Sequence, residues 1–258
     1  LGDWKAPKDW YNKAVQEKKK WDSYVAKESG PTNQELPSYA HAVGAVYRNA
    51  DPSDIVVTAA GGLVGEVVQI WKPKQLNTFE TEWGFSCMGY EISGALGIKM
   101  AKPDQDVIVF VGDGSYLLQN SDIYSSVIYN KKLIIVVCDN GGHMVINRLQ
   151  LAKGGKEYLC NLRSARASNV QFVDFEAHAK SMGANGETVK STSELEAAFK
   201  RAKESEKTYV ISMLTHGYEW LEGSAFWESP TLEVHSSDGN KKAYEEFLEG
   251  KNKQRKGV

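Results

Sequence analysis

Hydrophobic residues along the chain form short continuous runs, and amphipathic segments separate these runs. The clearest runs, rich in Val and Ile, lie at 54–60, 106–111, 132–139 and 208–214, with a shorter one at 77–81. Such runs are typical of strands buried on both faces of a parallel sheet. Helical spacing of the apolar positions predicts helices at 61–71, 88–101, 116–130, 144–153, 174–182 and 193–204. The alternation predicts an α/β fold, a central parallel sheet with helices on both faces.

The two ends of the chain differ from this pattern. Residues 1–33 are rich in Lys and Trp and are predicted to form a linker or helical extension with a solvated surface. Ser38 is a suitable N-cap for the next helix. We expect residues 34–215 to form the main domain. Residues 216–258 are expected to be an aromatic segment, either a lid or the cover of a hydrophobic face, followed by a solvated tail.

The composition excludes several classes of partner. The 258 residues carry a formal net charge of −2, so there is no electrostatic reason to expect binding to nucleic acid or to an anionic membrane. No apolar run approaches the roughly 20 residues that a transmembrane helix needs. The three cysteines, Cys87, Cys138 and Cys160, lack the spacing of a zinc site or a disulfide framework. A cytoplasmic protein is therefore expected.

Glycines and polar residues follow three of the predicted strands. Gly112-Asp113-Gly114-Ser115 follows one buried run, Asp139-Asn140-Gly141-Gly142 follows the next, and Gly61-Gly62 follows the first. Ligands of open parallel sheets bind beyond the carboxyl ends of the strands. If these strands are neighbours, the three segments meet at one pocket.

The residue types at these strand ends favour a diphosphate held by a metal ion. Gly114 and Ser115 lead into a helix, whose first amides attract an anion. Asp113 would repel a phosphate unless a divalent cation lay between them, and Asn140 and the Gly142 carbonyl offer further oxygen ligands. Each pattern alone is more often a plain turn. Together, each after a buried strand, they are more specific.

These motifs resemble a known signature. Gly112-Asp113-Gly114, a 25-residue spacer and Asn140 are similar to the metal motif of thiamine-diphosphate-dependent enzymes. The preceding "GFSCMGYEISGALGIKMAKPDQDVIVFVGDGS" resembles the same region of the acetohydroxyacid synthase and pyruvate oxidase group. The resemblance covers roughly residues 34–215. It implies the diphosphate-binding domain of that fold, with thiamine diphosphate and Mg²⁺ as cofactors.

The resemblance implies a role for each matching position. Asp113, Asn140 and the Gly142 carbonyl would bind Mg²⁺. The segments expected to contact the cofactor contain Gly61, Gly62, Leu63, Ser86, Met88, Gly114 and Ser115. Of these, Met88 would support the bent form of the cofactor, although it could equally be a core residue. His143 would lie near the cofactor and bond a substrate hydroxyl or move protons, and a loop histidine bonded to backbone is an equally good interpretation.

A narrower resemblance concerns the reaction. The runs "ELPSYAHAVGAVYR", "TAAGGLVGE", "FSCMGYEISG", "VGDGSYLLQNSDIYSSV" and "VCDNGGHMVINRLQ" resemble one branch of the family, the trihydroxycyclohexane-1,2-dione hydrolases of myo-inositol catabolism. These enzymes open a cyclic 1,2-diketone by cleaving a C–C bond to give 5-deoxyglucuronate. The resemblance implies the same small-molecule substrate here.

One part of the family's machinery has no match in the sequence. The family activates the cofactor with a glutamate from a separate pyrimidine-binding domain, and the two domains meet across a subunit interface. Glu66, Glu82 and Glu91 lie inside the diphosphate-binding segment and are not candidates for this role. We therefore expect this chain to be the C-terminal part of a longer enzyme and to be inactive by itself. The complete enzyme is expected to form a homodimer or homotetramer.

Two other interpretations remain open at this point. The chain could be the cofactor-binding subunit of a two-chain decarboxylase or acetohydroxyacid synthase-like enzyme. It could also be a response-regulator-like or nucleotide-binding domain that uses Asp113 and Mg²⁺. The last one lacks a phosphate-binding lysine beside Gly114-Ser115 and leaves Asn140 unexplained.

Overall fold

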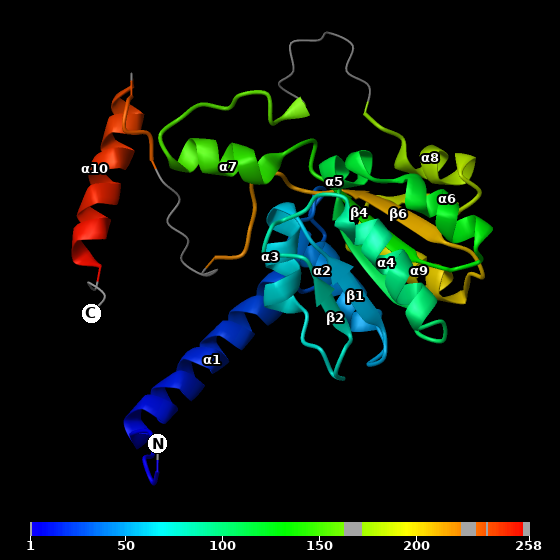
Figure 1. The fold of residues 1–258 in the computed structure, drawn as a ribbon, viewed down its shortest axis with the longest axis horizontal. Helices are drawn as coiled ribbons and strands as arrows, with labels where there is room; N and C mark the ends of the chain where they lie inside the picture. Colours follow the sequence, from blue (N-terminus) through cyan, green and yellow to red (C-terminus); the bar gives the residue numbers. More distant parts are fainter. Residues whose placement is uncertain (1, 163–171, 223–230, 236, 255–258) are drawn as a thin grey trace.

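The fold is a parallel six-stranded sheet with helices on both faces, as the sequence predicts. The computed structural model describes residues 2–162, 172–222, 231–235 and 237–254. The strand order is β2-β1-β3-β4-β6-β5, and every pair is parallel. The strands are β1 (Ile55–Thr58), β2 (Phe79–Thr81), β3 (Val107–Gly112), β4 (Ile134–Asp139), β5 (Asn185–Val189) and β6 (Tyr209–Leu214) (Figure 1).

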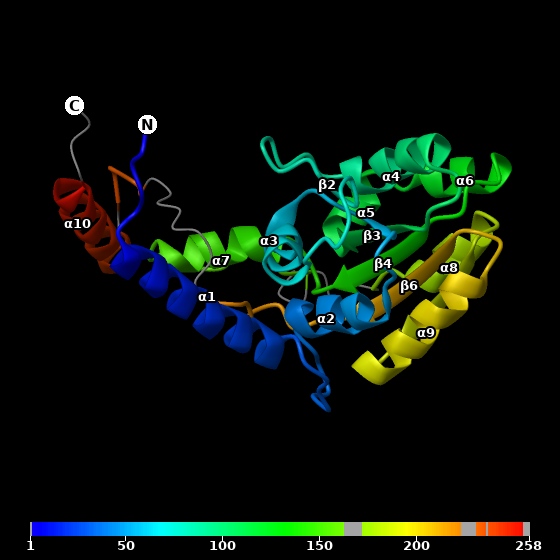
Figure 2. The same cartoon turned by 90° about the horizontal axis from the view of Figure 1, so that it is seen from below.

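Two apolar layers cover the sheet. Helices α2 (Tyr39–Asn49), α3 (Gly61–Ile70) and α9 (Thr192–Glu204) pack on one face. Helices α4 (Tyr90–Ala101), α5 (Asp113–Leu118), α6 (Ser121–Ile128) and α8 (Phe175–Ser181) pack on the other. Figure 2 shows α2 and α9 on one side of the sheet and α4 and α6 on the opposite side. Because both faces are covered, the central strands are apolar at nearly every position.

The central strands β3 and β4 fix where the sequence motifs lie. Their register pairs Gly112 with Cys138, so the next residues, Asp113 and Asp139, follow at the same edge of the sheet. The strand order reverses beside β1, since β2 lies on one side of it and β3 on the other. A reversal of this kind opens a crevice at the carboxyl ends of the strands, where ligands of such sheets bind.

The helical extensions lie away from the sheet. Helix α1 (Lys8–Glu28) projects from the body and buries only Val25, in keeping with the predicted solvated helix (Figure 1). Helix α7 (Met144–Ala152) leads from the sheet toward α10 (Asp238–Lys253), which has no buried residue. Phe226 and Trp227 of the predicted aromatic segment lie outside the described residues. None of the helices in the described ranges is long and apolar enough to cross a membrane.

One predicted helix is wrong in its bounds. The sequence predicts a single helix at 116–130, whereas the structure has α5 starting at Asp113 and α6 starting at Ser121. Gln119 leaves helical geometry, with φ −147° and ψ 84°. The side-chain amide of Asn120 donates to the Tyr116 carbonyl at 3.2 Å. Asn often bonds to backbone groups in this way and so ends a helix.

Other boundaries agree closely with the predicted ones. Ser38 caps α2, and its hydroxyl accepts a hydrogen bond from the His41 amide, as expected for an N-cap. Helices α3, α4, α7, α8 and α9 and strands β1, β2, β3, β4 and β6 fall on the predicted segments to within a few residues. The three cysteines are free, and Cys138 is buried in β4.

Candidate active site

Four loops meet at the carboxyl edge of the sheet. They follow β1 and β3, precede α4, and follow β4, and they contain the glycine-marked motifs of the sequence. A Cβ atom at Gly114 would lie 2.8 Å from the His143 ring and 3.5 Å from the Met88 methyl group. The β3, β4 and α4 loops are therefore in contact.

Asp113 is a buried carboxylate at this edge. Its residue is 4% exposed, and burial raises its pKa to about 7. The nearby Asp139 carboxylate also raises this pKa, whereas hydrogen bonds from the amides of Gly114, Asp113 and Gly142 lower it. No Lys, Arg or His of the described ranges forms an ion pair with Asp113. A cation at this position would remove the penalty that burial places on the charged form.

Asn140 lies buried at the end of the neighbouring strand. Its Nδ2 donates to the Tyr39 hydroxyl at 2.6 Å, and Tyr39 is itself 4% exposed. Asn140 Oδ1 is buried and has no hydrogen-bond partner within the described part of the chain. Buried polar atoms are rarely left unpaired unless a ligand or ion satisfies them. The hydrogen bond to Tyr39 thus holds the amide with its oxygen available.

Gly142 is held next to Asp113 by the loop that follows β4. Its amide bonds to the Asp113 carboxylate, and its φ of 143° is outside the range that side chains readily adopt. A Cβ here would collide with the Cys160 carbonyl oxygen. The neighbouring backbone bonds, His143 N to Cys160 O at 2.8 Å and Leu162 N to Gly141 O at 2.8 Å, fix the loop. Only glycine fits at 142.

His143 and Gly114 face each other at the surface of this site. His143 is exposed and precedes α7, and its side chain makes no capping bond. Its ring occupies the space that a side chain at position 114 would need. Met88 is 38% exposed and is not a core residue, so the structure disfavours the core interpretation.

The start of α3 forms another wall of the site. Gly61 is exposed with φ 79°, and nothing lies within 4 Å of a Cβ placed there. A Cβ at Gly62 would lie 3.1 Å from the Trp220 ring. Leu63 is 2% exposed, and its side chain belongs to the core, so only its backbone can contact a ligand. The first amides of this helix have no partner within the helix and point to an anion site.

Ser86 and Ser115 have different environments. Ser86 is exposed and adopts φ 52°, so its loop is tightly turned. Ser115 is 3% exposed, and its hydroxyl donates to Glu91 Oε2 at 2.7 Å. Glu91 is fully buried. Glu91 and Tyr39 lie within runs that carry the family resemblance, but the sequence assigns neither of them a role at the site.

A second buried acid lies behind the α3 wall. Burial raises the pKa of Glu66 to about 7, while the Leu221 amide and Arg148 lower it. Leu221 N donates to Glu66 Oε1 at 3.0 Å, and Oε2 has no partner among the residues described. Arg148 lies 4.9 Å from the centre of the Trp220 ring. These contacts attach Leu221 to α3 and Trp220 to α7.

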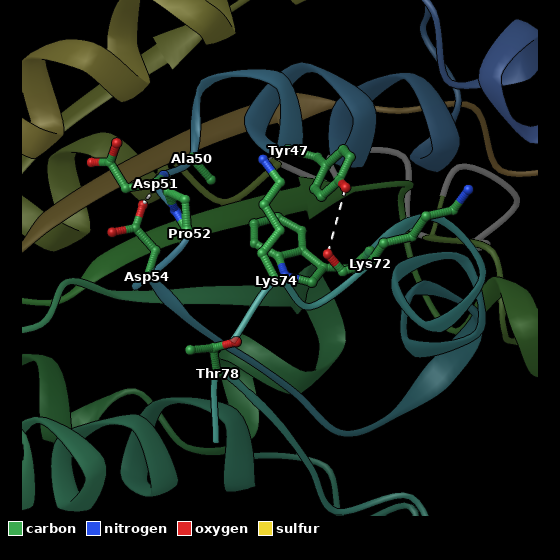
Figure 3. Close-up of a pocket in the computed structure, with 9 residues that line it drawn as sticks. Tyr47, Ala50, Asp51, Pro52, Asp54, Lys72, Lys74 and Thr78 are labelled. Atoms are coloured by element: carbon green, nitrogen blue, oxygen red, sulfur yellow. Dashed lines mark hydrogen bonds between the residues drawn. The ribbon is translucent and has the colours of Figure 1, made fainter. Parts of the chain in front are cut away.

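A pocket at the opposite edge of the sheet offers little chemistry. Figure 3 shows it at the start of β1 and β2, where Tyr47, Ala50, Asp51, Pro52, Asp54, Trp71, Lys72, Lys74 and Thr78 line it. Its charged groups have partners already. Lys203 binds both Asp51 and Asp54, and Lys72 binds Asp22. Lys74 lies over the Tyr47 ring at 5.7 Å.

Comparison with known proteins identifies the family. Residues 59–213 match the family described as "Thiamine pyrophosphate enzyme, C-terminal TPP binding domain", and this range is more than half of the chain. The chain belongs to this family. The match includes both strand ends with the buried polar groups, Asp113 and Asn140.

Several relatives share a narrower similarity with this thiamine pyrophosphate enzyme domain. The 3D-(3,5/4)-trihydroxycyclohexane-1,2-dione hydrolase of Halalkalibacterium halodurans is 37% identical over 201 residues, 76% of this chain and 31% of its own length. Proteins of the same name from Listeria monocytogenes and Bacillus subtilis are 39% and 34% identical, over 76% and 83% of this chain and 31% and 33% of their own. The chain thus spans about a third of the length of these curated relatives.

A solved structure supports the fold. The thiamine diphosphate-dependent 4-hydroxybenzoylformate decarboxylase of Rhodococcus jostii superposes with a TM-score of 0.64 at 19% identity. The alignment covers 72% of this chain and 34% of the decarboxylase. At this identity the similarity shows a common fold and not a common substrate.

The residues at the carboxyl edge fit the family's cofactor and a hard cation. Asp113 and Asn140 offer a buried carboxylate and an unpaired amide oxygen, which are ligands that Mg²⁺ prefers. No cluster of three or more His, Cys, Asp or Glu side chains that could bind a metal occurs in the described ranges. At Gly61 nothing lies within 4 Å of a Cβ position, so the start of α3 leaves space for a diphosphate.

Proposed function

We propose that this chain is the diphosphate- and Mg²⁺-binding part of a thiamine-diphosphate-dependent hydrolase. The substrate would be a cyclic 1,2-diketone, trihydroxycyclohexane-1,2-dione, which is opened to 5-deoxyglucuronate in myo-inositol degradation. The family match supports the cofactor, and the names of the relatives support the reaction. The observation that carries the metal site is the pairing of a buried acid with an unpaired amide oxygen at adjacent strand ends.

Asp113 and Asn140 would bind the cation through their side-chain oxygens, with the Gly142 carbonyl as a third ligand. The cation would then neutralise the charge of the diphosphate, which Asp113 alone would repel. Backbone amides at Gly61 and Gly62, at the start of α3, would donate to the phosphate oxygens. In the structure the Gly114 amide bonds to Asp113, so this amide serves the metal ligand.

The bound cofactor would supply the carbanion chemistry that cleaves a C–C bond next to a carbonyl. The residues of this chain would bind and orient it. Met88 is exposed beside Gly114 and would support its bent form. His143, whose ring also lies beside Gly114, would hold or move a proton at a substrate hydroxyl. Main-chain groups at Ser86 and Met88 would contact the pyrimidine ring.

A second protein region is needed for activity. Of the three glutamates that precede or follow the cofactor loops, Glu66 and Glu91 are buried, and Glu82 accepts hydrogen bonds from the amides of Phe85 and Cys87. We therefore propose that the activating glutamate belongs to a pyrimidine-binding domain, in a longer chain or in a partner subunit. A cytoplasmic homodimer or homotetramer would bring the two domains together.

Calorimetry tests the proposal directly. The purified protein is titrated with thiamine diphosphate in the presence and absence of Mg²⁺, and the same titrations are made with Asp113→Ala. We expect binding that needs Mg²⁺ and is lost in the variant. Equal binding by both proteins would exclude the metal site. Turnover of the cyclic diketone, measured with and without a pyrimidine-binding domain, tests the reaction and the need for the second domain.

A further inference from the structure

Glu91, in the first turn of α4, is a buried carboxylate that contacts three loops. Its exposed fraction is 0%. Oε1 accepts a hydrogen bond from the Ala60 amide at 3.1 Å. Oε2 accepts one from the Gly89 amide at 2.9 Å and one from the Ser115 hydroxyl at 2.7 Å. The carboxylate thus binds segments that follow β1, precede α4 and follow β3.

Each of these three donors is next to a residue of the candidate site. Ala60 precedes Gly61, Gly89 follows Met88, and Ser115 follows Gly114. The Ser115 hydroxyl also accepts from the Gly89 amide at 2.7 Å, so two of the loops are bonded to each other as well. A single side chain therefore bonds to all three loops that are expected to contact the diphosphate and the pyrimidine ring of the cofactor.

A carboxylate at this position is costly for stability. Among the described residues no Lys, Arg or His forms an ion pair with Glu91. Three hydrogen bonds replace its hydration only in part, and apolar packing at the same place is often at least as stable as a buried charge. The backbone is also constrained, since Gly89 has φ 96° and a Cβ there would press on Gln119. The arrangement is better explained by a need for fixed loop geometry than by a need for stability.

We propose that Glu91 is a positioning residue for cofactor binding. It touches no ligand, because it is fully buried and its oxygens are occupied by protein donors. It acts by holding Gly61, Met88 and Gly114 in one arrangement. This inference rests on the proposed function, since it assumes that the three loops bind thiamine diphosphate.

Glu91→Gln is the main test, because it keeps the shape of the side chain and removes one acceptor. The new NH₂ group must face either the Ala60 amide or the Gly89 amide, both of which are donors, so one loop loses its bond. We expect the Kd for thiamine diphosphate at saturating Mg²⁺ to rise at least about tenfold. Removal of a negative charge near an anion site would by itself lower the Kd. The direction of the change therefore separates positioning from simple electrostatics.

Asp54→Asn is the matched control. Asp54 is a buried acid at the opposite edge of the sheet, where Lys203 binds it at 2.6 Å. Loss of the Asp54 charge destabilises the protein far from the loops that Glu91 bonds to. The Kd for thiamine diphosphate should therefore stay within about twofold of wild type. Glu91→Gln bound with the wild-type Kd, even with a lower melting temperature, would show a structural role only and overturn the inference.

Two further measurements make the result decisive. Hydrogen exchange of the Ala60 and Gly89 amides should be faster in Glu91→Gln and unchanged in Asp54→Asn. If Glu91→Gln does not fold, Ser115→Ala is the substitute, because it removes one of the three bonds to Glu91 and also the bond from the Gly89 amide. The Kd should rise about threefold, and an unchanged Kd overturns the inference. A wild-type protein that binds no thiamine diphosphate with Mg²⁺ would instead refute the proposed function itself.

Discussion

A buried aspartate lies at each edge of the sheet. The groups that neutralise the negative charge differ between the two edges. At the amino edge Asp54, 4% exposed, accepts two bonds from Lys203 at 2.8 and 2.6 Å. Lys203 also binds Asp51 at 2.7 Å and lies 3.4 Å from Asp106. At the carboxyl edge Asp113 is also 4% exposed and accepts hydrogen bonds from backbone amides. No Lys, Arg or His of the described residues forms an ion pair with it.

This difference separates a structural acid from a candidate ligand. Burial raises the pKa of both carboxyls, yet only Asp54 has a lysine that lowers it again. A protein that uses an acid for stability gains by supplying its own cation, because an unpaired buried charge is expensive. An acid kept without one, next to the unpaired oxygen of Asn140, is suited to a cation from solution. Substitutions at the two aspartates and at the residues that bond to them test this comparison.

The largest effect is expected from Asp113→Asn. The variant keeps the size of the side chain but loses the charge that the metal needs, so Mg²⁺-dependent binding of thiamine diphosphate should weaken about 100-fold or more. Its free energy of unfolding without ligands should stay within about 1 kcal/mol of wild type, since the buried charge had no basic partner. Isothermal calorimetry and urea unfolding measure the two quantities. A large loss of stability with unchanged binding would reverse the assignment of this edge.

Asp54→Asn should give the opposite result. It leaves Lys203 with fewer acceptors in a partly buried position, so the free energy of unfolding should fall by about 2 kcal/mol. Cofactor affinity should not change. Urea unfolding with Lys203→Met and the double variant completes the cycle, and additive losses would mean that the 2.6 Å pair contributes nothing of its own.

A smaller effect is expected from the residue that orients Asn140. Tyr39→Phe removes the acceptor of the 2.6 Å bond from Nδ2, so the amide is free to rotate and present nitrogen to the metal. Metal affinity should fall about tenfold, in the range usual for residues that orient ligands. Binding of Mn²⁺, followed by electron paramagnetic resonance, measures this without turnover.

Tyr47→Phe is the control for this substitution. Tyr47 is on the same helix, α2, and its hydroxyl only reaches the Lys72 carbonyl at 3.5 Å (Figure 3). Metal affinity should be unchanged in this variant. Equal losses in the two variants would mean that α2 packing, and not the orientation of Asn140, determines the affinity.

The sequence was most informative where the chain itself brings the relevant residues together. Val- and Ile-rich runs predicted the strands, and an acid or amide directly after two of them predicted Asp113 and Asn140 at one edge. The sequence does not determine which strands are neighbours, and the structure answers this by pairing β3 with β4, with Gly112 opposite Cys138.

Other features depend on contacts between residues far apart in the sequence. Tyr39 bonds to a residue 101 positions away, and Glu91 bonds to Ala60, 31 positions away. Neither separation leaves a periodic pattern, and a buried Glu in a helix looks like any polar position. Apolar spacing continues across the break between α5 and α6, so the hydrophobic pattern predicts a single helix there. The break depends on the bond from the Asn120 side chain to the Tyr116 carbonyl, which this pattern does not report.

The smallest expected effect concerns Glu66 and its dependence on pH. Burial raises its pKa from 4.5 to about 7 in the folded protein, so between these values the folded state binds a proton that the unfolded state has released. Stability is therefore fully present below pH 4.5 and falls as pH rises through about 7. Glu66→Gln stays neutral, so relative to the variant the wild type should lose about 1 kcal/mol between pH 6 and pH 8. Urea unfolding at both values measures this. Glu176→Gln should keep the wild-type slope, because the hydrogen bond from Lys180 lowers the pKa of Glu176 and keeps it charged at both values. A Glu66→Gln slope equal to that of wild type would mean that Glu66 stays charged beside Arg148.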